Sequence, residues 1–183
     1  MTPEDITIVN ATHPDYAGFV FAGGRHQISL KQARTLRKQL DPAIVSVGVF
    51  VNAPLDAMLA ALNQNIISVV QLHGNEPEAV VEMLQERGAK VIRVFKGDRD
   101  YLPATSADYV MVDAGAGSGQ KLNWQRIKHP TQPLFLAGGL TPENVTQAVN
   151  IVHPFAVDVS SGVEGNHGKD HKRVASFIAS VRN

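Results

Sequence analysis

The sequence of 183 residues contains no cysteine and no excess of charge of either sign. Without cysteine, disulfides, thiolate metal sites and cysteine catalysis are excluded for these residues, and the absence is typical of a reducing cytoplasm. Seventeen Lys and Arg residues balance seventeen Asp and Glu residues, so no bulk positive field favours nucleic acid or an anionic membrane as a partner. We therefore expect a small-molecule ligand held at a local site.

Long hydrophobic runs are also missing. No apolar run approaches the roughly 20 residues of a membrane span. The N-terminus carries acidic residues where an export signal would carry a basic stretch followed by an apolar one. These features predict a cytoplasmic protein. With 44% hydrophobic residues, the chain is long enough for one filled core, and we expect a single domain over residues 1–183.

Short β-branched runs recur along the chain, each followed by a loop and a helical pattern. The runs are 17–21, 45–51, 68–72, 90–95, 109–113, 134–137 and 155–160. Buried parallel strands have this composition, and repeated strand–helix units with short connections imply a parallel sheet. The runs begin about every 20 to 25 residues, which favours a compact (β/α)₈ barrel over a doubly wound sheet.

Start signals for helices lie between these runs. Ser29-Leu-Lys-Gln has the pattern of a capping box. Asn52 and Asn75 each stand near an early proline, as capping residues do, and Pro142 is expected at the first position of another helix. These signals predict helices that follow the strands directly.

The first residues, Met1-Thr-Pro-Glu-Asp-Ile, have the pattern of a helix cap and first turn. No strand-like run precedes them. Seven runs leave an eight-stranded barrel one strand short. We therefore expect an α/β fold, a (β/α)₈ TIM barrel with strand 1 missing from this chain.

Two loops near the C-terminus have the composition of a phosphate site. Gly138 and Gly139 follow the run 134–137 and precede a helical pattern, while Ser160, Ser161 and Gly162 end the run 155–160. Glycines let backbone N–H groups approach an anion, serines add donors, and helix N-termini add partial positive charge. One such loop alone would favour an ordinary tight turn, but two adjacent loops favour phosphate binding.

Asp113 ends the run 109–113, where a carboxylate can transfer protons at the mouth of a barrel. A turn-forming aspartate is an equal alternative from this position alone. The glycine-rich segment 114–120 follows it and has the composition of a loop that closes over a ligand. Asp158 lies within a strand run, where we expect it to orient backbone groups.

Gln71 and His73 alternate along one strand, so both side chains are expected on the same face, toward the barrel interior. They are candidate substrate-binding residues, although a lone strand histidine is more often structural. Arg25, in a loop after the run 17–21, is a candidate clamp for a carboxylate, and a solvated loop arginine is its alternative.

Several segments taken together resemble the phosphoribosylanthranilate isomerase family. They are Gly18-Phe-Val-Phe, Val47-Gly-Val-Phe-Val-Asn, Val70-Gln-Leu-His-Gly, Val112-Asp, Gly117-Ser-Gly, Leu136-Ala-Gly-Gly-Leu-Thr-Pro-Glu-Asn-Val and Phe155-Ala-Val-Asp-Val-Ser-Ser-Gly-Val-Glu. Their order and spacing cover nearly the whole chain. The third and the last of them are together highly specific to this family.

The resemblance implies an Amadori rearrangement in tryptophan biosynthesis, in which N-(5-phosphoribosyl)anthranilate becomes a 1-deoxyribulose derivative without cofactor or metal. It gives Asp113 the role of general acid on the ring oxygen. The family's arginine for the anthranilate carboxylate stands where this chain has His26, so the adjacent Arg25 is our candidate for that role. The family's general base is a cysteine on its first strand, so the resemblance also implies weak activity for the 183-residue chain.

Two other functions remain open from the sequence. Another phosphosugar barrel enzyme would share the phosphate loops, but it would need a lysine-rich mouth or metal ligands at the strand ends, and neither pattern is present. A non-catalytic protein that binds a phosphate ligand would keep the loops and lack turnover. The sequence makes no prediction of oligomeric state.

Overall fold

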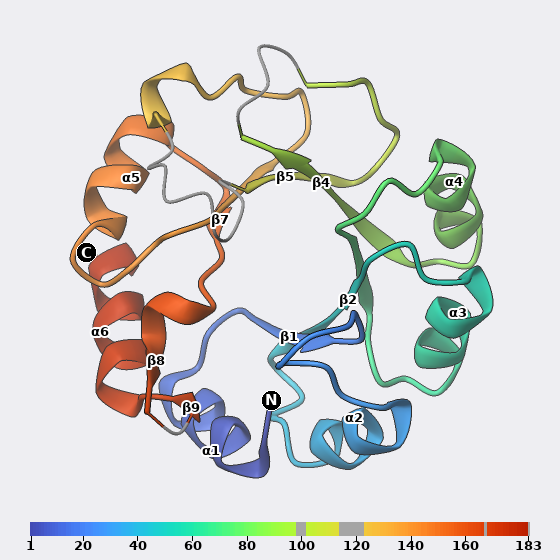
Figure 1. The fold of residues 1–183 in the computed structure, drawn as a ribbon, viewed down its shortest axis with the longest axis horizontal. Coiled ribbons are helices and arrows are strands. Elements are labelled where there is room, and N and C mark those ends of the chain that lie inside the picture. Colours follow the sequence, from blue (N-terminus) through green and yellow to red (C-terminus); the bar gives the residue numbers. More distant parts are fainter. Residues whose placement is uncertain (98–101, 114–122, 167, 183) are drawn as a thin grey trace. The chain divides into compact units, whose positions relative to one another are not determined.

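The computed structural model describes residues 1–97, 102–113, 123–166 and 168–182, and the chain divides into two compact units (Figure 1). The first unit is Met1–Arg93 with Thr105–Asp108, and the second is Val94–Ala104 with Tyr109–Asn183. Each unit consists of parallel strands connected by loops and helices. The segment 114–120, expected from its composition to close over a ligand, lies outside the described residues.

The first unit alternates helices and strands from its first element onward. Its elements are α1 (Pro3–Thr12), β1 (Tyr16–Val20), α2 (Leu30–Arg37), β2 (Val45–Phe50), α3 (Leu55–Asn63), β3 (Val69–Leu72), α4 (Glu78–Glu86) and the first part of β4 (Lys90–Lys96). The strands pair in parallel in chain order. Helices α2, α3 and α4 all lie on one side of these strands (Figure 1).

The second unit repeats this plan with shorter elements. It contains the end of β4, then β5 (Tyr109–Asp113), η1 (Trp124–Arg126), β6 (Leu134–Ala137), α5 (Val145–Val152), β7 (Ala156–Val157), η2 (Ser161–Val163), β8 (Glu164–Gly165), β9 (Gly168–Lys169) and α6 (His171–Arg182). Strands β5, β6 and β7 pair in parallel, whereas β8 and β9 form a short antiparallel pair.

All seven predicted strands are present, and the expected parallel pairing is confirmed from β1 to β4 and from β5 to β7. The predictions for 109–113 and 134–137 match residue for residue. The prediction for 155–160 was too long, because β7 covers only Ala156–Val157 before the chain turns into η2. The expected absence of a first barrel strand stays a prediction.

The helix starts were predicted with mixed success. The predicted cap at Thr2 and the predicted capping box at Ser29 are confirmed. The predicted caps at Asn52 and Asn75 were wrong, because prolines cap α3 and α4 without a side-chain hydrogen bond. Pro142 was also misplaced, since α5 begins three residues later at Val145. Among the described residues, no helix is long and apolar enough to cross a membrane.

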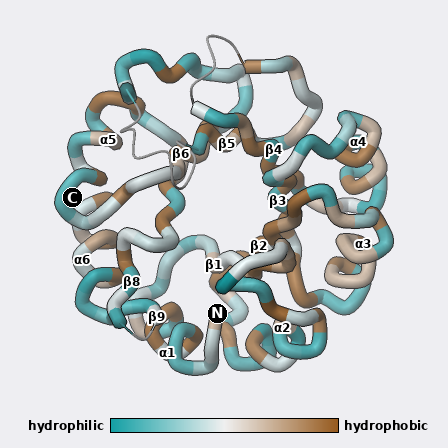
Figure 2. The backbone as a smooth tube through the Cα atoms, viewed as in Figure 1, coloured by the Kyte–Doolittle hydropathy of each residue, from teal (hydrophilic) through white to brown (hydrophobic). Residues whose placement is uncertain are grey.

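The hydrophobic core of each unit lies between its strands and its helices. In the first unit, Val70 and Leu72 pack into this core with residues of α2, α3 and α4. In the second unit, Val110 and Val112 pack with residues of α5 and α6. Strands β2, β3 and β4 carry most of the hydrophobic colour in Figure 2. Because side chains alternate along a strand, the residues between these core positions face the opposite side of the sheet.

Candidate functional site

The loops that follow β6 and β7 are in direct contact. A Cβ atom added to Gly162 would lie 1.9 Å from the carbonyl oxygen of Leu140. No side chain can occupy that space, because the obstacle is backbone. Glycine at position 162 therefore lets the two loops, predicted separately as parts of one phosphate site, approach each other closely.

Two glycines with left-handed backbone angles and an asparagine side chain fix the shape of the loop that follows β6. Gly138 and Gly139 have φ angles of 91° and 68°, which favour glycine. The amide of Asn144 donates to the carbonyl oxygen of Gly139 at 3.0 Å and accepts from the N–H of Thr141 at 2.8 Å. No described residue accepts a hydrogen bond from the N–H of Gly138 or Gly139. These donors are available to an anion.

The second loop consists of Ser160 and the turn η2. The N–H of Val163 donates to the carbonyl oxygen of Ser160 at 3.5 Å and closes the turn. The N–H groups of Ser161 and Gly162 begin η2 and donate to no described residue. The five residues predicted to bind phosphate thus lie in two touching loops with unpaired backbone donors.

Asp113 stands at the level of these loops. It pairs in register with Ala137, the residue directly before Gly138. Neighbouring strands lie about 4.8 Å apart, so the end of β5 is close to the first loop. The core residues of β5 are Val110 and Val112, so alternation places Asp113 on the face opposite the helices. A half-buried carboxylate on this face can exchange a proton with a ligand that the loops hold.

Gln71 and His73 lie together on β3 and at its end. Nε2 of Gln71 is 3.1 Å from Nδ1 of His73, which confirms that the two side chains share a face. The N–H of His73 also donates to the carbonyl oxygen of Phe50 on β2. Because Val70 and Leu72 face the helices, Gln71 and His73 face the other side of the sheet. The pair is therefore positioned at the carboxyl end of the strand, where substrate contacts were predicted.

Arg25 and His26 also contact each other. Nε of Arg25 donates to Nε2 of His26 at 3.0 Å, in the loop that follows β1. Nε2 of His26 is the acceptor of this bond. Arg25 carries a charge at all relevant pH, and its guanidinium can bind both oxygens of a carboxylate.

Sequence reasoning missed Glu76, which joins the loops after β2 and β3. Its carboxylate accepts from the N–H of Asn52 at 2.7 Å and from the N–H of Gly74 at 3.0 Å. Nη1 of Arg93 on β4 lies 3.7 Å from the same carboxylate, and both side chains are almost fully buried. Glu76 therefore connects the ends of β2 and β3 with the middle of β4. A local pattern could not reveal it, because Asn52 is 24 residues away.

Gly74, like Gly162, lies too close to a neighbouring loop to accept a side chain. A Cβ atom at Gly74 would lie 2.5 Å from Oδ1 of Asn52. That oxygen accepts a hydrogen bond from the N–H of Asn75, and Asn52 itself has a φ of 50°. The two asparagines expected to cap helices thus connect two loops instead.

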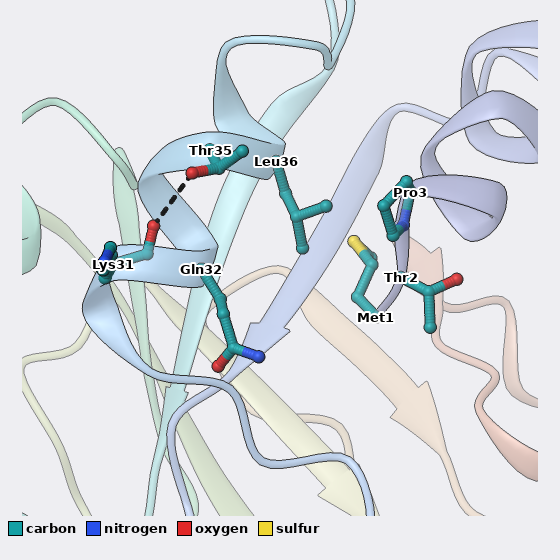
Figure 3. A pocket seen from close by; sticks show the side chains of 7 residues that line it. All are labelled: Met1, Thr2, Pro3, Lys31, Gln32, Thr35 and Leu36. Atoms are coloured by element: carbon teal, nitrogen blue, oxygen red, sulfur yellow. Dashed lines mark hydrogen bonds between the residues drawn. The ribbon is translucent and has the colours of Figure 1, made fainter.

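The first unit also contains a surface cavity of about 520 Å³ between α1 and α2 (Figure 3). Met1 and Pro3 line it from the start of α1, and Lys31 and Leu36 line it from α2. None of the predicted site residues borders this cavity. Among the described residues, no group of three or more His, Cys, Asp or Glu side chains could hold a metal ion.

The strand–helix repeats, with glycine-rich loops at the carboxyl ends of the strands, define a class: α/β proteins of the TIM-barrel type. Comparison with known proteins identifies the member of that class. A family model described as N-(5'phosphoribosyl)anthranilate (PRA) isomerase matches residues 1–180. The chain belongs to the phosphoribosylanthranilate isomerase family, enzymes of tryptophan biosynthesis, and the resemblance seen in the sequence is confirmed.

Similar proteins include an N-(5'-phosphoribosyl)anthranilate isomerase of Lacticaseibacillus casei, 53% identical over all of this chain and 91% of the relative. Phosphoribosyl anthranilate isomerase of Thermotoga maritima is 32% identical, with a TM-score of 0.82 over 100% of this chain and 95% of that one. A solved isomerase in complex with reduced 1-(o-carboxyphenylamino)-1-deoxyribulose 5-phosphate is 31% identical, with a TM-score of 0.80 over 99% and 94% of the two chains. 3-Hexulose-6-phosphate synthase, at 16% identity and a TM-score of 0.72, shares the fold alone.

Proposed function

We propose that this chain converts N-(5'-phosphoribosyl)anthranilate into 1-(2-carboxyphenylamino)-1-deoxyribulose 5-phosphate, with Asp113 as the general acid. Asp113 donates its proton to the ring oxygen while the bond from C1 to that oxygen breaks. The nitrogen lone pair forms a C1=N bond in this step, and loss of the C2 proton then gives an enol amine. Protonation of C1, with loss of the proton of the C2 hydroxyl to the Asp113 carboxylate or to water, gives the ketose. Removal of the C2 proton needs a separate base, and none of the residues above has that role.

The phosphate is held by backbone N–H groups around Gly138, Gly139, Ser160, Ser161 and Gly162. The observation that carries this assignment is the contact between the two loops at Gly162, next to N–H groups without a described acceptor. A bound phosphate supplies those acceptors. Inorganic phosphate and sulfate should therefore compete with the substrate.

Three further residues are assigned to the substrate. Arg25 holds the anthranilate carboxylate, supported by its guanidinium group and by the hydrogen bond that fixes it against His26. Gln71 and His73 bind the substrate as a pair, supported by their 3.1 Å contact. We expect a cytoplasmic enzyme that works without metal or cofactor, with a small phosphosugar as its ligand and neither nucleic acid nor membrane as a partner.

The proposal is tested by following the loss of substrate fluorescence during turnover, with calorimetry of the reduced product analogue alongside. Turnover together with analogue binding supports an isomerase. Analogue binding without turnover points to a binding protein. A second protein with an added strand that ends in Cys-Gly tests the expectation, made from the sequence, that a cysteine supplies the base. If neither protein binds the analogue, the proposed function is wrong.

A further inference from the structure

Lys169 contacts the phosphate loop without having been predicted as a site residue. Its ammonium group donates to the carbonyl oxygen of Ser160 at 2.8 Å and lies 3.5 Å from the hydroxyl of the same residue. It also donates to Oε1 of Glu164 at 3.0 Å. Only 21% of the Lys169 side chain and 11% of the Glu164 side chain are exposed. The ion pair with Glu164 is therefore partly shielded from solvent, whereas the contact with Ser160 is exposed.

The backbone holds Lys169 in this place. Glu164 and Lys169 are directly opposite each other in the antiparallel pair of β8 and β9. The N–H of Asp170 donates to the carbonyl oxygen of Val163, which attaches the far end of the hairpin to η2. The lysine thus reaches back over the turn that contains Ser161 and Gly162.

The contact with the Ser160 carbonyl decides which way the next N–H points. A trans peptide unit is planar, and its C=O and N–H point in opposite directions. The described residues contain no cis peptide bond. Since Lys169 and the N–H of Val163 both attract the carbonyl oxygen of Ser160, the N–H of Ser161 points away from them. That N–H is one of the donors proposed for the phosphate.

We propose that Lys169 is a positioning residue for phosphate binding: by holding the Ser160 carbonyl, it aims the Ser161 N–H at the phosphate. The inference rests on the proposed function, because it deepens the phosphate site assigned there. Lys169 does not touch the substrate in this role. Its removal leaves the Ser160 carbonyl with the longer 3.5 Å contact from the N–H of Val163, so the Ser161 N–H is less firmly oriented while the rest of the site remains.

The test compares Lys169→Met, Lys169→Arg and Lys172→Met in the full chain. Lys172 is an exposed residue of α6 three positions further on, so its variant removes the same charge without touching the loop. Calorimetry measures the Kd for inorganic phosphate, for the reduced product analogue and for that analogue without its phosphate. Lys169→Met should raise the first two Kd values roughly tenfold, as expected for a lost hydrogen bond to a charged group, and leave the third unchanged.

Arginine at position 169 should restore most of the affinity, and Lys172→Met should bind like the wild type. Equal weakening for the phosphorylated and dephosphorylated analogues, or no weakening at all, overturns the role of Lys169. If the wild type itself does not bind inorganic phosphate, the phosphate site of the proposed function fails, which is a distinguishable result. If Lys169→Met does not fold, Glu164→Gln tests the same contact, because it removes the charge that holds Lys169. This variant should raise the Kd for inorganic phosphate about threefold. An unchanged Kd in Glu164→Gln also overturns the role of Lys169.

Discussion

In the first unit, carboxylates hold the loops around the strands, whereas glycines and amide or hydroxyl groups form the corresponding loops of the second unit. Glu76 accepts backbone hydrogen bonds from two strand ends, Glu78 accepts one from Ser106, and Asp108 accepts one from Val91. A carboxylate that accepts an N–H group leaves no donor for a ligand. In the second unit the N–H groups of Gly138 and Gly139 have no described acceptor, and they can bind an anion.

The comparison shows two ways to build the loops of the same strand–helix plan. Side chains of the protein accept the backbone N–H groups of the loops in one unit, whereas some of these N–H groups remain available to a ligand in the other. A loop closed by a carboxylate of the protein has its backbone hydrogen bonds made before any ligand binds. A loop of left-handed glycines around unpaired donors gains its last hydrogen bonds from the bound molecule. The following predictions test this division, beginning with the largest expected effect.

Replacing Asp113 by Asn should lower kcat by about 10² to 10⁴, because removal of a general acid typically has that effect. The Kd of the reduced product analogue should change much less. Both are measured in the more active of the two proteins described above, by fluorescence and by calorimetry. Near-normal turnover in the variant would make Asp113 a turn residue and leave the second unit without its assigned acid.

Gly162→Ala and Gly74→Ala form a matched pair, one in each unit. Each added methyl group meets atoms within 3.0 Å, so each variant should lose about 1 to 3 kcal/mol of stability from overpacking. Only Gly162→Ala should also weaken the binding of inorganic phosphate. Thermal melts and calorimetry check both effects. If Gly74→Ala weakens phosphate binding as much, the proposed division between the units is wrong.

The same melts test the expectation of a single domain over residues 1–183. Both variants should then lower the midpoint of one cooperative transition. Two transitions, each sensitive to only one of the variants, would show that the units unfold separately.

Arg25→Ala should raise KM roughly tenfold, because a charge-assisted hydrogen bond to the substrate carboxylate is lost. Steady-state kinetics across a range of pH show whether Arg25 or His26 binds the substrate carboxylate. An unchanged KM would count against Arg25. In the wild type, a KM that rises only above about pH 6.5 would assign the contact to His26, since that is where an ordinary histidine loses its charge.

The smallest effect concerns acid stability. Burial tends to raise the pKa of Asp108, but hydrogen bonds from Lys90, Gln85 and the backbone of Val91 outweigh it and hold that pKa below its ordinary 3.8. Burial likewise tends to raise the pKa of Glu78, while hydrogen bonds from Ser106 and Thr105 lower it below 4.5. A depressed pKa in the folded state stabilises the protein above the ordinary value.

That contribution is lost as the pH falls through the folded value. Unfolding should therefore become easier as the pH falls below about 4.5 for Glu78 and below about 3.8 for Asp108. Denaturant melts at pH 7 and pH 3.5 measure it, with Glu78→Gln as the test variant. Exposed Glu82 on the same helix provides the control, as Glu82→Gln. Equal pH dependence in Glu78→Gln and in the wild type would contradict this account.

Most of the fold and part of the site could be predicted from the sequence. Apolar runs such as 134–137 predict buried strands, and the caps at Thr2 and Ser29 are local signals that the structure keeps. Asn52 was misassigned as a helix cap because its side chain accepts a hydrogen bond from Asn75, far along the chain. Local sequence preferences do not predict such a long-range contact. The glycines of the proposed phosphate loops were predicted from composition alone, and their contact with phosphate stays a prediction.

Glu76 and Lys169 could not be found in the same way. The partners of Glu76 are two backbone N–H groups and Arg93, and nothing in its immediate sequence distinguishes it from a helix-start acid. Lys169 acts on a carbonyl nine residues earlier through a hairpin of only two paired residues on each side. Such contacts depend on the path of the backbone in three dimensions, which a strand or helix pattern does not describe.

The close approach of Gly162 to the carbonyl oxygen of Leu140 limits which substitutions the two loops can accept, in evolution and in protein engineering. The backbone path of one loop cannot change without the other, because a shift of either loop closes the space between Gly162 and Leu140. Random mutagenesis aimed at accepting a bulkier group in place of phosphate should therefore recover paired changes, one near position 140 and one near position 162. Libraries that vary a single loop should return mostly inactive clones.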